Sequence, residues 1–221
     1  MNSISITGKG SIHVAPDVTR LETTIEQWFK TYEEAYTQAR ENSSWFVKIL
    51  EYNHKPGKLA KTTCFDISDH IESKYDEDGD VIGHFKNGYD LTQRVKIDLP
   101  IDNKLVNNIV RGIGKFIKGA QINIGYTVED PRPHQLKMIG RAAADAKAKA
   151  EIILKELGCS VGDVININYR EGGVSVYSQA RNIHSNQEAM SSTADSLDIA
   201  PDDLVMNDTV DVEFQIINPN K

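Results

Sequence analysis

The sequence predicts an α+β fold in which antiparallel β-sheets with long hairpins pack against one long alanine-rich helix and one or two further helices. Three observations predict this class. Apolar residues recur at helical spacing over residues 136–157, several segments alternate between apolar and polar residues, and two such segments flank an Asp-Gly pair at 78–79. The 221-residue chain is long enough for one large domain or two small ones. We therefore expect one domain over residues 1–221, with two lobes as an open alternative.

The long helix is predicted by a stripe of apolar residues spaced alternately by three and four positions. Gly158 supplies the left-handed position that ends many helices, and Pro131 and Pro133 suit the helix entry or its first turn. The middle of the stripe is alanine, and small side chains allow a helix to approach a flat sheet closely. The stripe comprises Leu136, Ile139, Ala143, Ala146, Ala150, Ile153 and Leu157.

The remaining elements follow from alternation and from breaking residues. Ala15-Pro16-Asp17 separates two predicted strands, and Gly8 and Gly10 in the first strand indicate a bulge or a close backbone approach. Proline and glycine at positions 56 and 57 end the first predicted helix. In chain order we expect strands at 3–14 and 18–29, a helix at 31–52, a hairpin at 62–99, a shorter amphipathic segment at 102–118, and strands at 120–129, 163–177 and 209–217.

The hairpin permits a prediction of its register. A two-residue loop at 78–79 would place the apolar residues of the two strands on opposite faces. A three-residue loop over 77–79, with Gly79 left-handed, pairs Asp76 with Asp80 and keeps both apolar sets on one face. We predict the three-residue loop. The resulting pairs are Phe65 with Leu91, Ile67 with Tyr89, and Ile71 with Phe85.

Residues 178–203 are polar and poor in large apolar side chains. A connection of this length is unusual in a compact domain and is typical of a functional or disordered segment. We predict a flexible loop. If the loop instead docks a partner, its anchors are Ile183, Met190 and Leu197, which are the candidate partner-binding residues of the chain.

Charge and composition argue against several classes of protein. The net charge is −7 with dispersed lysine and arginine, which disfavours nucleic-acid binding. No apolar run approaches the roughly 18 residues of a membrane span, and the first residues enter a strand pattern without a leader-like segment. Cys64 and Cys159 are expected to be free thiols. The sequence as given therefore predicts a cytoplasmic protein, with the periplasm or cell envelope as the alternative if a leader was removed.

No motif predicts catalytic residues, a cofactor or a metal site. The predicted register sets His84 opposite Glu72 with His70 diagonal to both, so a surface metal site is one alternative and a solvated polar face is the preferred one. Acidic residues at 76–80 resemble a calcium loop, but position 12 of that loop is Asn87 rather than glutamate. A charged hairpin tip is the better interpretation.

Several short matches occur in a fixed order along the chain. They are Gly8-x-Gly10, Ala15-Pro16-Asp17, Gly88-Tyr89, the run 126–131, Ala143, Asp145-Ala146, Lys149-Ala150, Leu157-Gly158 and the Val-x-Val-x-Phe strand at 210–214. Together they resemble the SIMPL-domain family, a bacterial domain of unknown function that also occurs in a eukaryotic signalling-associated protein. The resemblance implies an α+β fold, oligomers in some members and no established catalytic residues, and many bacterial members are exported to the cell envelope.

The function class follows from what the sequence contains. We expect a non-enzymatic interaction or assembly module that self-associates or binds a protein partner through sheet edges or an exposed helix face. A small-ligand binder with a cleft between sheet and helices is one alternative. The other is an enzyme whose site is assembled from scattered residues.

Overall fold

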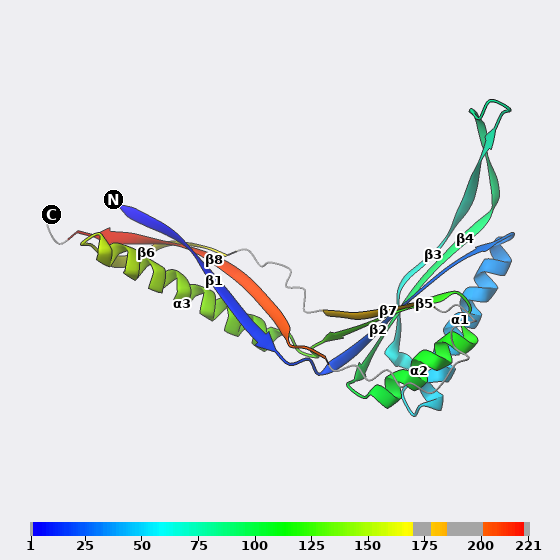
Figure 1. Cartoon of the computed structure of the whole chain (residues 1–221), viewed down its shortest axis with the longest axis horizontal. Coiled ribbons are helices and arrows are strands. Elements are labelled where there is room, and N and C mark those ends of the chain that lie inside the picture. Colours follow the sequence, from blue (N-terminus) through cyan, green and yellow to red (C-terminus); the bar gives the residue numbers. More distant parts are fainter. Residues whose placement is uncertain (1, 170–177, 185–200, 219–221) are drawn as a thin grey trace. The chain divides into compact units, whose positions relative to one another are not determined.

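The computed structural model describes residues 2–169, 178–184 and 201–218, and for 178–184 it describes the backbone alone. This part of the chain forms three helices of more than one turn and two antiparallel sheets, which confirms the α+β class (Figure 1). It divides into two compact units. Unit 1 contains residues 1–16, 127–177 and 202–221, and unit 2 contains residues 17–126 and 178–201.

Unit 1 is a three-stranded sheet covered on one face by a helix. The strand order is β1 (Ser3–Val14), β8 (Leu204–Ile217), β6 (Ser160–Asn168), and the helix is α3 (Arg132–Glu156). β1 and β8 pair without a register shift over the full length of β1. The core is formed by the alanines of α3 against alternating residues of β8. Its buried members are Ala142, Ala146, Ala150, Val210, Val212 and Phe214.

The face of α3 that packs on the sheet differs in part from the predicted stripe. Ala146 and Ala150 are fully buried, as predicted. The rest of the buried face follows a strict four-residue spacing through Met138, Ala142 and Leu154. The predicted stripe was therefore wrong at Leu136, Ala143, Ile153 and Leu157, which are exposed, whereas Ile139 is partly buried against the core.

Gly8 and Gly10 select which face of α3 is buried. A Cβ atom at Gly8 would lie 2.0 Å from the carbonyl oxygen of Ala142, and one at Gly10 would lie 2.1 Å from that of Met138. No larger residue fits at either position while α3 keeps this distance from β1. The prediction of a close backbone approach at these glycines is confirmed, and it identifies α3 as the neighbouring element.

Unit 2 is a five-stranded sheet with two helices. The strand order is β3 (Ala60–Tyr75), β4 (Val81–Pro100), β2 (Val18–Phe29), β5 (Ala120–Thr127), β7 (Ser178–His184). The helices are α1 (Tyr32–Tyr52) and α2 (Asn103–Phe116), and a single 3-10 turn, η1 (Gly57–Leu59), precedes β3. Thr31 and Glu34 form a capping box that starts α1, and the Asp102 carboxylate accepts two backbone N–H groups at the start of α2.

The core of unit 2 lies between the two helices and the sheet. α1 contributes Phe46, Ile49 and Leu50, and α2 contributes Ile109 and Ile113. These side chains pack on the alternating inner residues of β2, β4 and β5, which include Leu21, Ile25, Ile97, Leu99, Ile122 and Ile124. Tyr32 was predicted on the buried side of α1 but is half exposed, because at the first turn of the helix its ring makes only an edge contact with Tyr89 of β4, with centroids 5.8 Å apart.

The chain connections differ from the simplest prediction at two places. β1 and β2 belong to different sheets, so the Ala15-Pro16-Asp17 turn links two units rather than closing a hairpin. Within the polar segment 178–203, residues Ser178–His184 form β7 and pair with β5, and β8 begins at Leu204 instead of 209. Residues 185–200 lie outside the described residues, and their flexibility stays a prediction.

The hairpin prediction is confirmed at the loop and wrong along the strands. The backbone N–H of Asp76 donates to the carbonyl of Asp80, and Gly79 has a φ of 88°, as the three-residue loop requires. Register shifts beyond the loop then move the pairs. Phe65 pairs with Gln93, Ile67 with Leu91, and Ile71 with Lys86. The physical reason is a set of bulges, each of which inserts an unpaired residue and shifts all later pairs by one.

Replacing Gly8 by alanine should destabilise the protein, because the new methyl group would clash with the backbone carbonyl oxygen of Ala142. A backbone group cannot move aside by changing rotamer as a side chain can. Overpacking of this kind costs about 1–3 kcal/mol in the free energy of unfolding. The matched control is Gly140→Ala in α3, where a Cβ meets nothing within 4 Å. That substitution should stabilise by up to about 1 kcal/mol through helix propensity. Urea denaturation followed by far-UV circular dichroism measures both; equal effects of the two substitutions would contradict the close-approach explanation.

Candidate interaction surfaces

The hairpin of β3 and β4 extends past the rest of its sheet. The last residue of β2, Phe29, lies opposite Tyr89 of β4. Beyond that point, among the described residues, β3 and β4 pair only with each other. We call residues 70–88 the arm (Figure 1). Both edges of the arm therefore present backbone N–H and C=O groups without a neighbouring strand.

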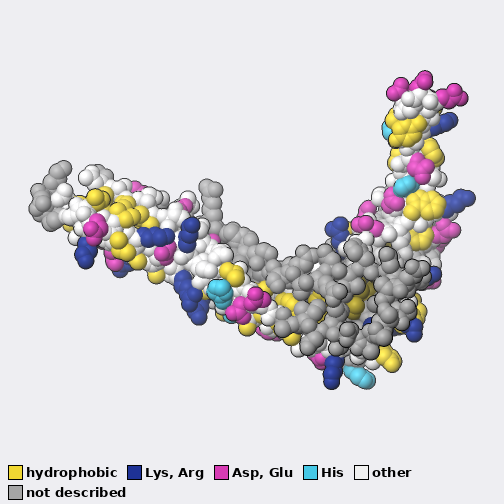
Figure 2. Space-filling model, viewed as in Figure 1, with side chains coloured by type: hydrophobic (Ala, Val, Ile, Leu, Met, Phe, Trp, Pro, Cys, Tyr) yellow, Lys and Arg dark blue, Asp and Glu magenta, His cyan; other side chains and the backbone are white. Residues whose placement is uncertain are grey.

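Large apolar side chains of the arm are exposed on both of its faces. Ile71 pairs with Lys86, so Ile71 and Phe85 point to opposite sides of the two-stranded ribbon. Figure 2 shows hydrophobic side chains along the arm and acidic ones at its tip. The exposed fractions are 55% for Ile71, 60% for Tyr75, 53% for Val81, 57% for Ile82 and 47% for Phe85. The sequence analysis had placed Ile71, Tyr75, Val81 and Phe85 on a single apolar face, because alternation does not reveal the bulges.

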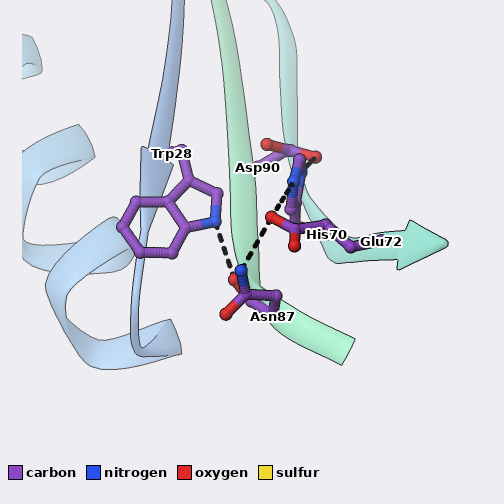
Figure 3. A network of polar contacts seen from close by, with 5 residues as sticks. All are labelled: Trp28, His70, Glu72, Asn87 and Asp90. Carbon is purple, nitrogen blue, oxygen red and sulfur yellow. Dashed lines mark hydrogen bonds and ion pairs between the residues drawn. The ribbon is translucent and has the colours of Figure 1, made fainter. Parts of the chain in front are cut away.

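A polar network fixes the base of the arm to the end of β2 (Figure 3). The indole Nε1–H of Trp28 donates to the backbone carbonyl of Asn87 at 2.8 Å, and the Asn87 side chain donates to Glu72 Oε1 at 2.7 Å. Gly88, with a φ of 118°, makes this possible, because a Cβ there would lie 2.4 Å from the carbonyl oxygen of Phe29. These contacts tie β2, β3 and β4 together where the arm leaves the sheet.

His70 is the titratable member of the network. Its Nδ1 lies 2.8 Å from Asp90 Oδ2, and its Nε2 lies 3.6 Å from Glu72 Oε1. The hydrogen bond to Asp90, helped by the charges of Asp90 and Glu72, raises the pKa of His70 above its ordinary value. The imidazole ring thus lies between two carboxylates, Glu72 on its own strand and Asp90 on the neighbouring one, which favours its protonated form.

The tip of the arm is a preorganised acidic loop. The Asp76 carboxylate oxygen Oδ1 accepts the backbone N–H groups of Asp78 and Asp80 at 3.1 and 2.8 Å, and Gly79 N–H donates to the Asp76 carbonyl. Asp76 thereby holds the turn. Glu77, Asp78 and Asp80 are exposed and form no ion pair with any other described residue.

A groove of about 640 Å³ lies between α1 and α2 in unit 2. One wall is a stack of two aromatic rings, Trp45 and Phe116, with centroids 4.4 Å apart and planes 10° from parallel. Lys48 and Lys115 lie over these rings, at 4.7 Å and 5.1 Å from the respective centroids. The groove is lined by Trp45, Lys48, Ile49, Tyr52, Asn53, Asn108, Arg111, Gly112, Lys115 and Phe116.

The structure gives limited information on the predicted site residues. Ile183 lies in β7, where its backbone pairs with Ile122, and its side chain is not described. Met190 and Leu197 lie outside the described residues. The role of these three residues as partner-binding anchors stays a prediction.

The geometry expected for a surface metal site does not form. Glu72 pairs with Phe85, and His84 pairs with Ser73, whose hydroxyl lies 3.2 Å from His84 Nδ1. Among the described residues no group of three or more His, Cys, Asp or Glu side chains is arranged to hold a metal ion. The bulge that moves His84 away from Glu72 is the same one that sequence alternation could not reveal.

The two units define the chain as an α+β protein with a helix-covered sheet in each and a protruding hairpin in unit 2. The model of the SIMPL family, described as a protein of unknown function (DUF541), matches residues 4–214. The chain belongs to this family. No curated protein matches the chain. None of the helices in the described ranges is long and apolar enough to cross a membrane.

Substituting Asp90 by asparagine should lower the pKa of His70 towards its ordinary value of about 6.5, because the main acceptor of the imidazolium is lost. Because the pKa of His70 is raised in the folded state, its protonation stabilises the folded protein. This stabilisation is fully present at pH values below the pKa of the unfolded state and is lost as the pH rises through the pKa of the folded state. NMR titration of the His70 ring protons measures the shift. The control Asp66→Asn, an exposed carboxylate further along β3, should leave it unchanged; a His70 pKa unaffected by Asp90→Asn would contradict the network.

Proposed function

We propose that the protein is a non-enzymatic assembly module that self-associates through the arm. The observation that carries this proposal is the exposure of five large apolar side chains on a ribbon whose two faces and two edges are open in the described structure. The small-ligand binder and the enzyme remain the alternatives to this proposal.

The proposal is supported by the energetics of an isolated hairpin. A two-stranded ribbon in water is marginally stable by itself, because it has no second layer on which to bury its apolar side chains. Covering apolar surface contributes roughly 25 cal/mol per Å², so ordering of the arm is favoured when another surface covers it. Exposed apolar surface is typical of protein–protein contacts, and the arm gathers five large exposed apolar side chains within residues 71–85.

The open edges of the arm support the same proposal. Unpaired backbone groups along a strand are a template for pairing with a further strand. The arm carries lysines at positions 74 and 86, which limit unspecific edge pairing without closing the edges. We infer that the contact combines side-chain burial on a face with backbone pairing at an edge.

As part of this proposal we place the module in the cytoplasm. Cys64 and Cys159 are both free and partly accessible in the structure. Free thiols of this kind are typical of a reducing compartment.

Replacing Ile71 and Phe85 by lysine should weaken self-association at least tenfold, about 1.4 kcal/mol, because both apolar faces of the arm then carry charge. The two side chains are half exposed, so folding should be little affected. Size-exclusion chromatography with light scattering over a concentration series measures the change. The control is Ile152→Lys, an equally exposed isoleucine of α3 in unit 1. A wild-type protein that stays monomeric at every concentration would sink the proposal.

A further inference from the structure

Unit 2 contains one acidic cluster and one region rich in basic residues. In residues 76–80 there are four acidic residues and no cation. In residues 44–61 and 103–119, which form the carboxyl-terminal half of α1, η1 and the whole of α2, there are eight lysines and arginines and one acidic residue, Glu51. The chain as a whole carries a net charge of −7, so the positive charge of this region is opposite in sign to the net charge of the protein.

The cations of the groove are available to an anionic partner. The ion pairs formed between described residues involve none of Lys48, Arg111 and Lys115. Lys48 and Lys115 are held over the faces of Trp45 and Phe116, which directs two ammonium groups along one aromatic wall. A volume of about 640 Å³ lies in the range of roughly 300–1,000 Å³ that is usual for binding sites.

The acidic tip cannot fill the groove of its own copy. β3 begins at Ala60, directly after η1, which packs beside the carboxyl end of α1. It then runs for 16 residues to Tyr75, which is about 50 Å at 3.3 Å per residue. Paired strands do not fold back over such a length. The tip and the groove within one molecule are therefore complementary in charge and separated in space.

We propose that the acidic tip of the arm, residues 76–80, docks in the basic aromatic groove between α1 and α2 of a second copy of this chain. This inference rests on the proposed self-assembly and assigns its second surface. Glu77 and Asp78 face Arg111 and Lys115 of the neighbouring copy. Asp76 keeps its place inside the turn, so the tip enters already shaped, and little conformational entropy is lost on docking.

Each copy carries one tip and one groove. Two copies can therefore exchange tips in a reciprocal two-fold dimer, and successive head-to-tail contacts can instead form a closed ring or an open filament. Because exposed charges dominate the contact, it weakens as ionic strength rises and shortens the Debye length.

A charge-swap experiment on the full chain tests the docking. The tip variant carries Glu77→Lys and Asp78→Lys, and the groove variant carries Arg111→Glu and Lys115→Glu. Each variant alone should lose self-association at least tenfold in sedimentation velocity at low salt. An equimolar mixture should recover it, because each reversed surface then meets a complementary one. The matched control reverses two exposed cations of α3, Arg132→Glu with Lys137→Glu, and should assemble as the wild type does.

The outcomes separate this inference from the proposed function. If both charge variants assemble as the wild type does while the Ile71 and Phe85 variant does not, the arm-mediated assembly stands and the docking into the groove is overturned. If each charge variant is monomeric and the mixture does not recover, the specific pairing is overturned. A monomeric wild type overturns the self-assembly itself.

A direct probe identifies the occupant of the groove. A cyclised peptide with the sequence of residues 73–82 should shift the indole N–H resonance of Trp45, and the peptide with Glu77 and Asp78 replaced by lysine should not. A single-stranded oligothymidine that shifts this resonance when the acidic peptide fails would overturn the proposal in favour of a nucleic acid. Inorganic phosphate that does so alone would overturn it in favour of a small anion.

Discussion

The unequal lengths of neighbouring strands determine the architecture of unit 2. β4 has 20 residues and β2 has 12, and the pairing of Val18 with Pro100 aligns them at one end. All of the excess length therefore lies at the other end, in residues 81–88, which precede Tyr89. β3, which follows β4 along its whole course, leaves the sheet together with it. The arm is thus a consequence of strand alignment, and the apolar residues on it lie beyond the reach of both helices.

The alignment also explains why a polar cluster lies where the arm begins. Beyond the last residue pair of β2 with β4, strand β4 has no neighbouring strand on that side within the described structure, and its backbone bulges at Gly88. The Trp28 indole donates to the Asn87 backbone carbonyl, which a regular ladder would have paired, and the carboxylates of Asp90 and Glu72 lie beside the His70 ring. Since the cluster connects three strands, it sets the direction in which the ribbon projects from the sheet.

Much of the fold could be predicted from local patterns, and the failures share one cause. Gly79 and the odd-numbered positions of the apolar residues in both strands were sufficient to predict the three-residue loop, because both are local properties of the sequence. The register of the strands was not predictable from alternation. Gly88 carried the signal, since a glycine inside a strand often marks a bulge, but its effect depends on the bulky Trp28 across the sheet.

The buried face of α3 illustrates the same limit. Alanines at 142, 143, 144, 146, 148 and 150 supply several possible stripes, and only the close approach of Gly8 and Gly10 selects one. The groove between α1 and α2 escaped prediction for a related reason. Its rings and cations come from segments about 60 residues apart in the chain, and no spacing within either segment shows that Trp45 stacks on Phe116.

The pairing of β1 with β8 has a consequence for synthesis on the ribosome. Val14 and Leu204 are partners in the ladder, so β1 waits for roughly 190 further residues before its neighbour exists. At about 5–20 residues per second this delay is on the order of 10–40 s. Strands β2 to β5 and both helices of unit 2 are complete by residue 127 and can collapse earlier. A nascent chain therefore carries β1 without its partner strand, and with Gly8 and Gly10 uncovered, throughout this interval, so its unpaired backbone groups are open to pairing with other strands.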